Sequence, residues 1–153
     1  MASFTMCPEC QAAYEDPRNR RFHAQPNACP VCGPQLSLAK SGEATSRRIA
    51  DLTPVREFLR QGQIVAVKGL GGFLLACDAT NEGAVCELRR RKRRSDKPFA
   101  LMARDLSEVE RFCVVSDRDR KPLTSSRRPI VIIPRISGSE IAECVAPGNA
   151  RLE

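Results

Sequence analysis

Four cysteines near the start of the sequence have the spacing of a metal site. They form two C-x2-C pairs, Cys7 with Cys10 and Cys29 with Cys32, and eighteen residues separate the pairs. Each pair lets two thiolates converge on one ion, and two pairs complete a tetrahedral sulfur site. Four soft thiolates select Zn2+ and leave no open position for a substrate. We therefore predict a closed, structural zinc site rather than two disulfides or four free thiols.

The only histidine of the chain, His23, lies between the two cysteine pairs. It could replace a cysteine as a ligand, hydrogen-bond a ligating sulfur from outside, or simply pack within the loop. Packing is the favoured interpretation because four cysteines are already available. With this single histidine between the cysteines, no Ser-His-Asp or Cys-His catalytic arrangement can be built.

A glycine-rich segment, Lys68-Gly69-Leu70-Gly71-Gly72-Phe73, lies between two predicted strands. Its glycines would let backbone N–H groups approach a phosphate or a carbonyl, and Lys68 would neutralise charge there. The segment lacks the spacing of a P-loop and of a dinucleotide-binding fingerprint. A tight turn between strands explains it equally well.

The second candidate site is basic. Lys92, Arg94 and Lys97 follow one another at the end of a predicted helix, where they could clamp the phosphates of a nucleotide. The net charge is +7, and the six consecutive basic residues 89–94 nearly account for it. Such a run attracts phosphates in nucleotides, nucleic acids or lipids, although a solvated helix end is an equally good interpretation.

Local patterns predict an α/β (α+β) fold with a mixed sheet over residues 51–153. Thr53-Pro54 starts a helix that Gly62 ends, and Asn81 or Thr80 caps a helix that leads into the basic run. Asp105 with Glu108 resembles a capping box, and a further helix is expected over 116–123. The expected strands are 64–67, 73–77, 99–102 and 130–133, the last being the strongest, and the pattern fades after residue 135.

The N-terminal part differs in composition. Residues 1–36 carry five prolines, which predicts a metal module without helices, and the polar segment 37–50 is predicted to be a linker. Four further cysteines show no pairing pattern: Cys77, Cys86, Cys113 and Cys144. Such unpaired cysteines are typical of a reducing compartment, so a cytoplasmic location is expected. All of them except Cys144 are expected in the core. No apolar run approaches the roughly 18 residues that span a bilayer.

Long strings of this sequence resemble one family, the HypF carbamoyltransferases of NiFe-hydrogenase maturation. The strings cover nearly the whole chain and include Phe4-Thr-Met-Cys-Pro-Glu-Cys10, Asp16-Pro-Arg-Asn-Arg-Arg-Phe-His23, Gln25-Pro-Asn-Ala-Cys-Pro-Val-Cys-Gly-Pro34, Ile64-Val-Ala-Val-Lys-Gly-Leu-Gly-Gly-Phe73, Ala76-Cys-Asp-Ala-Thr-Asn81, Asp96-Lys-Pro-Phe99 and Arg128-Pro-Ile-Val131. The resemblance implies a second zinc module at 1–36 and a YrdC-like domain, C-terminally incomplete, at 51–153. The acylphosphatase part, the first zinc module and the transfer domain of the family are then expected to be missing.

The activity implied by the resemblance is ATP-dependent. Carbamoyl phosphate is hydrolysed to carbamate, the YrdC-like domain forms carbamoyl-adenylate, and the group passes to the C-terminal cysteine of the partner HypE. By position, Lys68 and Lys97 match catalytic residues of the family, and Mg2+ is the ion expected with ATP. The residues that the resemblance implies as nucleotide contacts are Lys68, Gly69, Gly71, Gly72, Lys92, Arg94 and Lys97.

Two departures from the family pattern affect this assignment. Leu74 stands where the family has a histidine after the glycine turn, and the basic cluster can be aligned one residue earlier, on Arg91 and Arg93. The fragment alone is expected to be weakly active or inactive. The alternative is a zinc-ribbon module that binds RNA, as YrdC-like relatives act in tRNA modification.

Overall fold

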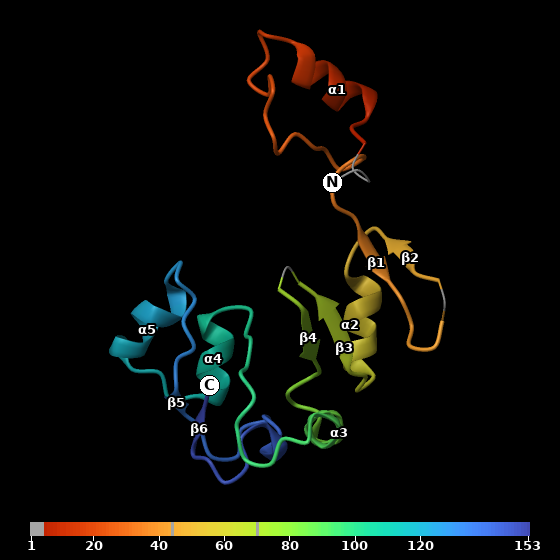
Figure 1. Cartoon of the computed structure of the whole chain (residues 1–153). Coiled ribbons are helices and arrows are strands. Elements are labelled where there is room, and N and C mark those ends of the chain that lie inside the picture. The colour runs from red at the N-terminus through yellow and green to blue at the C-terminus, as the bar shows by residue number, and fades with distance from the viewer. Residues whose placement is uncertain (1–4, 44, 70) are drawn as a thin grey trace. The chain divides into compact units, whose positions relative to one another are not determined.

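The computed structural model describes residues 5–43, 45–69 and 71–153 (Figure 1). The chain divides into two compact units, Met1–Leu52 and Thr53–Glu153. The glycine-turn residue Leu70 lies outside the described residues.

The first unit contains a helix, α1 (Pro8–Glu15), where none was expected. The proline-based prediction was wrong because Pro8 occupies the first turn, where a missing N–H costs nothing and the ring favours helical φ. Two further elements, β1 (Leu36–Leu38) and β2 (Arg47–Ile49), pair in antiparallel fashion. The segment expected to be a linker therefore carries a small hairpin.

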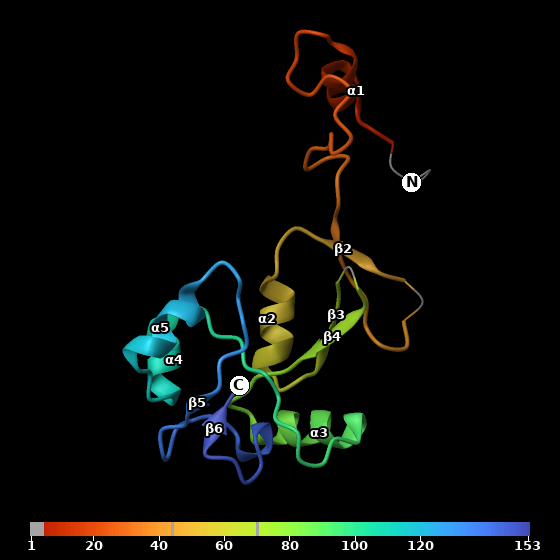
Figure 2. The ribbon, with the colours of Figure 1, turned by 60° about the vertical axis from the view of Figure 1, so that its left-hand side comes forward.

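The second unit starts with the helix–hairpin that the sequence predicts. Helix α2 (Thr53–Arg60) packs along β3 (Val65–Lys68), which pairs antiparallel with β4 (Phe73–Ala76) (Figure 2). Gly62 ends the helix with φ of +75°, while Gln63 N–H donates to the carbonyl of Phe58 at 2.9 Å. This is the left-handed C-cap that favours glycine.

Three more helices follow, each begun by the side chain of a polar residue. Asn81 Oδ1 accepts from Ala84 N–H at 3.0 Å to begin α3 (Glu82–Lys92). Asp105 likewise begins α4 (Leu106–Phe112), and a Ser116–Asp119 capping box begins α5 (Asp117–Thr124). The predicted caps at Asn81 and Asp105 are confirmed.

Two predicted strands were wrong or too long. Residues 99–102 form no strand, because Phe99 and Leu101 donate their N–H groups to two different segments, at Val145 and Glu153. Of residues 130–133 only the last enters a strand, β5 (Ile133–Pro134), because its partner β6 (Arg151–Leu152) pairs only with that part. Both errors come from apolar runs that lack a partner strand of matching length.

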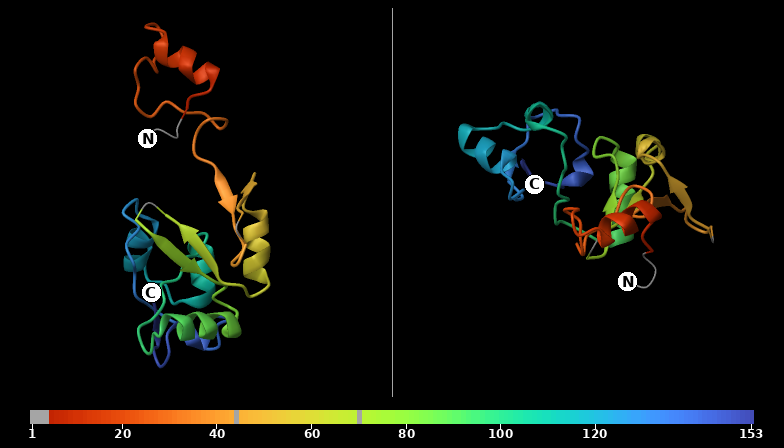
Figure 3. Two further views of the ribbon diagram at one scale, coloured as in Figure 1. Left: turned by 45° about the vertical axis from the view of Figure 1, so that its right-hand side comes forward. Right: turned by 90° about the horizontal axis from the view of Figure 1, so that it is seen from above.

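The core of the second unit depends on the part of the sequence with the weakest pattern. Eight residues form the buried cluster, and five of them lie between 141 and 152, around the short 3-10 helix η1 (Glu143–Val145). The cluster comprises Val85, Cys113, Ile133, Ile141, Ala142, Val145, Ala146 and Leu152. Figure 3 shows this C-terminal segment beside α3. Residues after 135 thus complete the packing.

The sequence showed no pairing pattern among the last four cysteines, and this indication was wrong for two of them. Cys86 on α3 and Cys144 on η1 form a disulfide, although 58 residues separate them in sequence and no local spacing indicates the pair. Cys113, in contrast, is buried as predicted, at 6 % exposed, and Cys77 is half-buried.

The mixture of helices and strands confirms the predicted α/β (α+β) class. The predicted mixed sheet is not formed by the described strands, which pair instead in three two-stranded antiparallel sheets. Among the described residues, no helix is both long and apolar enough to cross a bilayer.

Replacing Val145 tests the role of the C-terminal segment in the core. Val145 is 1 % exposed, so Val145→Ala leaves a cavity and is expected to lower the free energy of unfolding by about 2 kcal/mol. The matched control is Val114→Ala, since Val114 is 60 % exposed and should cost below about 0.5 kcal/mol. Urea denaturation measures both, and equal effects of the two variants would contradict this core.

Candidate functional site

The four predicted metal ligands come together in the first unit. The sulfurs of Cys7 and Cys29 lie 3.6 Å apart and those of Cys29 and Cys32 lie 3.8 Å apart. With Cys10, all four sulfurs lie within 4.8 Å of one another. A tetrahedral ion with bonds of about 2.3 Å separates its ligands by about 3.8 Å, so the spacing and the donor set fit zinc.

Two short elements hold these sulfurs. Helix α1 places Cys7 at its N-cap and Cys10 in its first turn, and the second pair lies on a tight turn closed by Gly33 N–H to the carbonyl of Cys29 at 2.7 Å. A Cβ on Gly33 would lie 2.7 Å from that same carbonyl oxygen. The turn can therefore close only with glycine at this position.

The four thiols differ in how readily they ionise. Burial raises the pKa of Cys10 to about 12, since that residue is only 2 % exposed and its neighbours are sulfurs. Backbone groups at Cys7 and Cys29 lower the pKa of Cys32 to about 6. A bound cation would remove this difference, because a coordinating thiol is deprotonated outright.

His23 packs in the loop, as the favoured interpretation predicts. Its ring stacks on Tyr14 of α1 with centroids 4.9 Å apart and an interplanar angle of 13°, and Phe22 covers it from another side. Its backbone is left-handed, with φ of +51°, and its N–H donates to the carbonyl of Tyr14 at 3.0 Å. His23 thus fastens the inter-pair loop to α1.

The glycine segment closes the β3–β4 hairpin. Gly69 N–H donates to the carbonyl of Gly72 at 2.8 Å, and Gly72 has φ of +147°, which an L side chain rarely adopts. Lys68 Nζ lies 4.9 Å from the centroid of the Phe73 ring. Leu74, in the place of the family histidine, is 69 % exposed on β4. The segment is a turn that keeps its lysine near the surface.

The basic segment at the end of α3 contains two kinds of residue. Arg94 donates through Nε to the carbonyl of Lys97 at 2.8 Å and also to the carbonyl of Pro98, so its guanidinium shapes the turn. Lys92 and Lys97 are exposed, and neither has an ion-pair partner among the residues that the structure describes. Within this segment the lysines therefore have ammonium groups available for a phosphate.

The rest of the basic run is largely engaged within the protein. Arg90 and Arg91 both pair with Glu87, at 2.7 and 2.6 Å, and their hydrogen bonds lower the pKa of Glu87 to about 2. Arg93 adopts a left-handed conformation that ends α3. The alternative alignment of the cluster on Arg91 and Arg93 thus places one ion-paired residue and one helix cap in the proposed site.

Arg89 is the residue that sequence reasoning missed. Its guanidinium donates to five backbone carbonyls, at distances of 2.8 to 3.2 Å, and lies over the ring of Phe99. The acceptors are Cys144, Val145, Arg94, Ser95 and Lys97. Nothing in the sequence distinguishes it from the five basic residues that follow.

The structure does not bring the two basic elements together. The turn after β3 lies at the end of the hairpin remote from α3, and no hydrogen bond or ion pair among the described residues joins it to 92–97 (Figures 1 and 2). A hollow of about 450 Å³ lies elsewhere, lined by Pro98, Ile132 and the C-terminal residues 149–151 and 153. It touches none of the predicted phosphate contacts.

Comparison with known proteins finds one family match for the cysteine-containing part of the chain and another for the second unit. Residues 6–39 match the family described as HypF finger, and residues 57–152 match the Sua5/YciO/YrdC family, described as telomere recombination. Carbamoyltransferase HypF of Rhodobacter capsulatus is 51 % identical over 99 % of this chain. Threonylcarbamoyl-AMP synthase of Vibrio vulnificus is 38 % identical, over 42 % of this chain and 35 % of its own length.

Two solved structures resemble the whole chain. HypF of T. kodakarensis superposes with a TM-score of 0.81 at 46 % identity, and full-length HypF in a phosphate- and nucleotide-bound form superposes with a TM-score of 0.75 at 42 % identity. Each covers 99 % of this chain, and the chain spans 20 % of each of them and of the Rhodobacter relative. The chain belongs to the Sua5/YciO/YrdC family, carries a HypF finger, and is a homologue of the HypF carbamoyltransferases.

Proposed function

We propose that this chain is the zinc-finger and YrdC-like portion of a HypF-type carbamoyltransferase that acts in the cytoplasm. In this proposal the YrdC-like part forms carbamoyl-adenylate from ATP and carbamate, for transfer to the C-terminal cysteine of HypE. Carbamate would come from carbamoyl phosphate, and the remaining domains of the parent protein would carry out its hydrolysis and the transfer. The fragment alone would be weakly active at most.

The observation that carries this proposal is the joint presence of both parts in one chain. The resemblance to HypF runs through the finger and the YrdC-like part at 51 % identity, whereas the match to threonylcarbamoyl-AMP synthase covers only 65 residues. The finger, with its four cysteines, Gly33 and the stacked His23, matches the family described as HypF finger over residues 6–39.

The chemistry proposed for the second unit needs cations that can reach phosphates. A carbamate oxygen attacks the α-phosphorus of ATP and pyrophosphate leaves, so negative charge moves onto the leaving group. Lys92 and Lys97 at the end of α3 would balance this charge together with Mg2+. The structure keeps the glycine turn apart from these two lysines, so Lys68 and the N–H groups of that turn would reach the same phosphates only after the hairpin and the 92–97 turn approach each other. Arg94 holds the turn that carries Lys97, so we propose that it acts by position.

The structure weakens the support for RNA binding. Three of the six consecutive basic residues are engaged within the protein. Arg89 donates hydrogen bonds to backbone carbonyls, and Arg90 and Arg91 pair with Glu87. A continuous row of free cations, which would give strong counterion release on a nucleic acid, is therefore shorter than the sequence indicates.

The finger is proposed to bind a structural Zn2+ through Cys7, Cys10, Cys29 and Cys32. Its four sulfurs would satisfy the ion completely, so its contribution is to the fold of residues 5–39 and not to catalysis.

ATP binding tests the proposed nucleotide contacts. Lys97→Ala and Lys68→Ala each remove one charge-assisted contact and are expected to weaken Mg2+–ATP binding roughly tenfold or more, measured by titration calorimetry on the 153-residue chain. Lys121→Ala is the matched control, because that lysine is exposed on α5 and should leave affinity unchanged. Absence of saturable ATP binding, or an equal loss in all three variants, would contradict the site.

Metal removal tests the finger. Chelation is expected to unfold α1 and to leave the second unit folded, because metal binding supplies most of the folding free energy of such a module. Circular dichroism and one-dimensional NMR measure both parts at once. Loss of metal with α1 intact would show that the ion has no structural role.

Adding one methyl group at Gly33 tests the geometry of the turn that carries the second cysteine pair. Gly33→Ala places a Cβ against the carbonyl of Cys29 and is expected to lower zinc retention at least tenfold in a competition with a chromogenic chelator. Gly83→Ala adds the same methyl on α3, where its nearest neighbour lies at an ordinary 3.5 Å, and should retain zinc as the parent does. Equal retention in both variants would speak against the turn geometry.

A further inference from the structure

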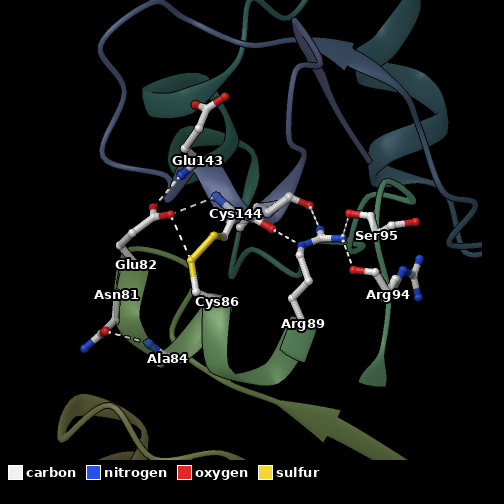
Figure 4. Close-up of a disulfide and its surroundings, with 10 residues drawn as sticks. Asn81, Glu82, Ala84, Cys86, Arg89, Arg94, Ser95, Glu143 and Cys144 are labelled. Carbon is white, nitrogen blue, oxygen red and sulfur yellow. Dashed lines mark hydrogen bonds between the residues drawn. A yellow bond between two sulfur atoms is a disulfide. The ribbon is translucent and has the colours of Figure 1, made fainter. Parts of the chain in front are cut away.

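Three residues on one face of α3 hold the C-terminal segment. Glu82, Cys86 and Arg89 follow one another at spacings of four and three residues, which places them in one stripe of the helix. Figure 4 shows this stripe facing η1, with the disulfide from Cys86 to Cys144 between a carboxylate on one side and a guanidinium on the other.

We propose that Cys86 and Cys144 form a reversible thiol–disulfide site whose exchange partners are dithiols. The thiolate of an incoming dithiol attacks one sulfur, the Cys86–Cys144 bond breaks, and a mixed disulfide forms. The second thiol of the reagent then resolves it. The dithiol loses two electrons and becomes a disulfide, while Cys86 and Cys144 gain two electrons and two protons and become thiols.

The pair lies where exchange is possible. Cys86 and Cys144 are both half-buried, and neither is a member of the eight-residue buried cluster, although Cys144 packs against it. Cys113, in contrast, is a member of that cluster, and burial raises the pKa of its thiol and that of Cys77. The second unit thus contains two half-exposed cysteines that are paired and two others, with suppressed ionisation, that are not.

Hydrogen bonds on both sides of the pair can remain when the Cys86–Cys144 bond is reduced. The Glu82 carboxylate accepts from the N–H groups of Glu143 at 2.6 Å and Cys144 at 3.0 Å. Arg89 donates to the carbonyls of Cys144 at 2.8 Å and Val145 at 3.1 Å. These four hydrogen bonds join α3 to η1 on both sides of the disulfide, so the fold should persist after reduction.

The same contacts favour re-formation of the disulfide. Because they keep the two thiols beside each other, the effective concentration of one thiol at the other is high. Glu82 has a further role, since its Oε1 lies 3.2 Å from Cys86 Sγ and would accept the S–H of the reduced form. Both redox states therefore have satisfied partners at this place.

A metal is the other ligand that the three groups could take. Glu82, Cys86 and Cys144 offer ligand atoms within 4.8 Å of one another. The carboxylate is already bound to two backbone N–H groups, however, and the sulfurs are bound to each other. The observed contacts therefore favour exchange.

Differential alkylation tests the proposal on the 153-residue chain with its zinc bound. The protein is equilibrated in buffers of reduced and oxidised dithiothreitol, alkylated, and analysed by peptide mass spectrometry. Cys86 and Cys144 are expected to titrate together as one two-electron step, while Cys77 and Cys113 do not depend on the buffer ratio. Circular dichroism of the reduced form should match that of the oxidised form.

Two variants test the cause of the pairing. Arg89→Lys loses most of its bonds to η1 and is expected to lower the disulfide equilibrium constant at least tenfold, which raises the midpoint reduction potential by about 30 mV or more. Arg91→Lys is the matched control, since Arg91 pairs with Glu87 and not with η1, and it should titrate as the parent does. Should Arg89→Lys fail to fold, Glu82→Gln removes the carboxylate instead, with the same expected direction.

Three results would overturn the proposal. The first is independent alkylation of Cys86 and Cys144 with no cross-linked peptide in any buffer. The second is unfolding of residues 53–153 on reduction, which would make the bond purely structural. The third is a buffer-independent dithiol that becomes protected only when Zn2+ is added in excess of the finger, which would indicate a metal site. None of these readouts involves ATP, so they are independent of the proposed function.

Discussion

The second unit depends on one arginine that satisfies the backbone of irregular segments. Residues 93–103 and 135–150 contain little regular structure, so their carbonyls cannot find partners in a helix or a sheet. Arg89 supplies hydrogen bonds to five of these carbonyls from a single planar fork of N–H donors. Through it, α3 is joined both to η1, which carries the buried Val145, and to the turn that carries Lys97.

This arrangement separates positioning from binding within one basic run. Arg89 and Arg94 bond carbonyls, Arg90 and Arg91 neutralise Glu87, and Lys92 and Lys97 are left exposed at either end of a tight turn. Arginine suits the first task because its donors are fixed in a fork, and lysine suits the second because it is a compact charge on a flexible stem. The proposed nucleotide contacts thus lie on a scaffold made by their own neighbours.

Local patterns predicted the parts of the fold that short-range chemistry decides. The cysteine quartet, the α2 helix with Gly62, the β3–β4 hairpin and the Asn81 cap all follow from spacings of a few residues. The Cys86–Cys144 pair could not be predicted, since its partners are 58 residues apart and neither has a distinctive neighbourhood. The same holds for Arg89, and for the core residues after 135, whose burial comes from packing against α3 and not from their own periodicity.

The central functional claim is that one ATP contacts both the Lys92–Lys97 turn and the glycine turn of the second unit, two segments that the structure holds apart and that ATP would have to bring together. Amide chemical shifts of the 15N-labelled, zinc-bound chain, recorded during titration with Mg2+–ATP, test it most directly. The account predicts saturable shifts at Gly69, Gly71, Gly72 and residues 92–97, with the finger amides of 5–39 unchanged. Shifts confined to the finger or to the hollow near Arg151, or no saturable shift at all, would contradict it.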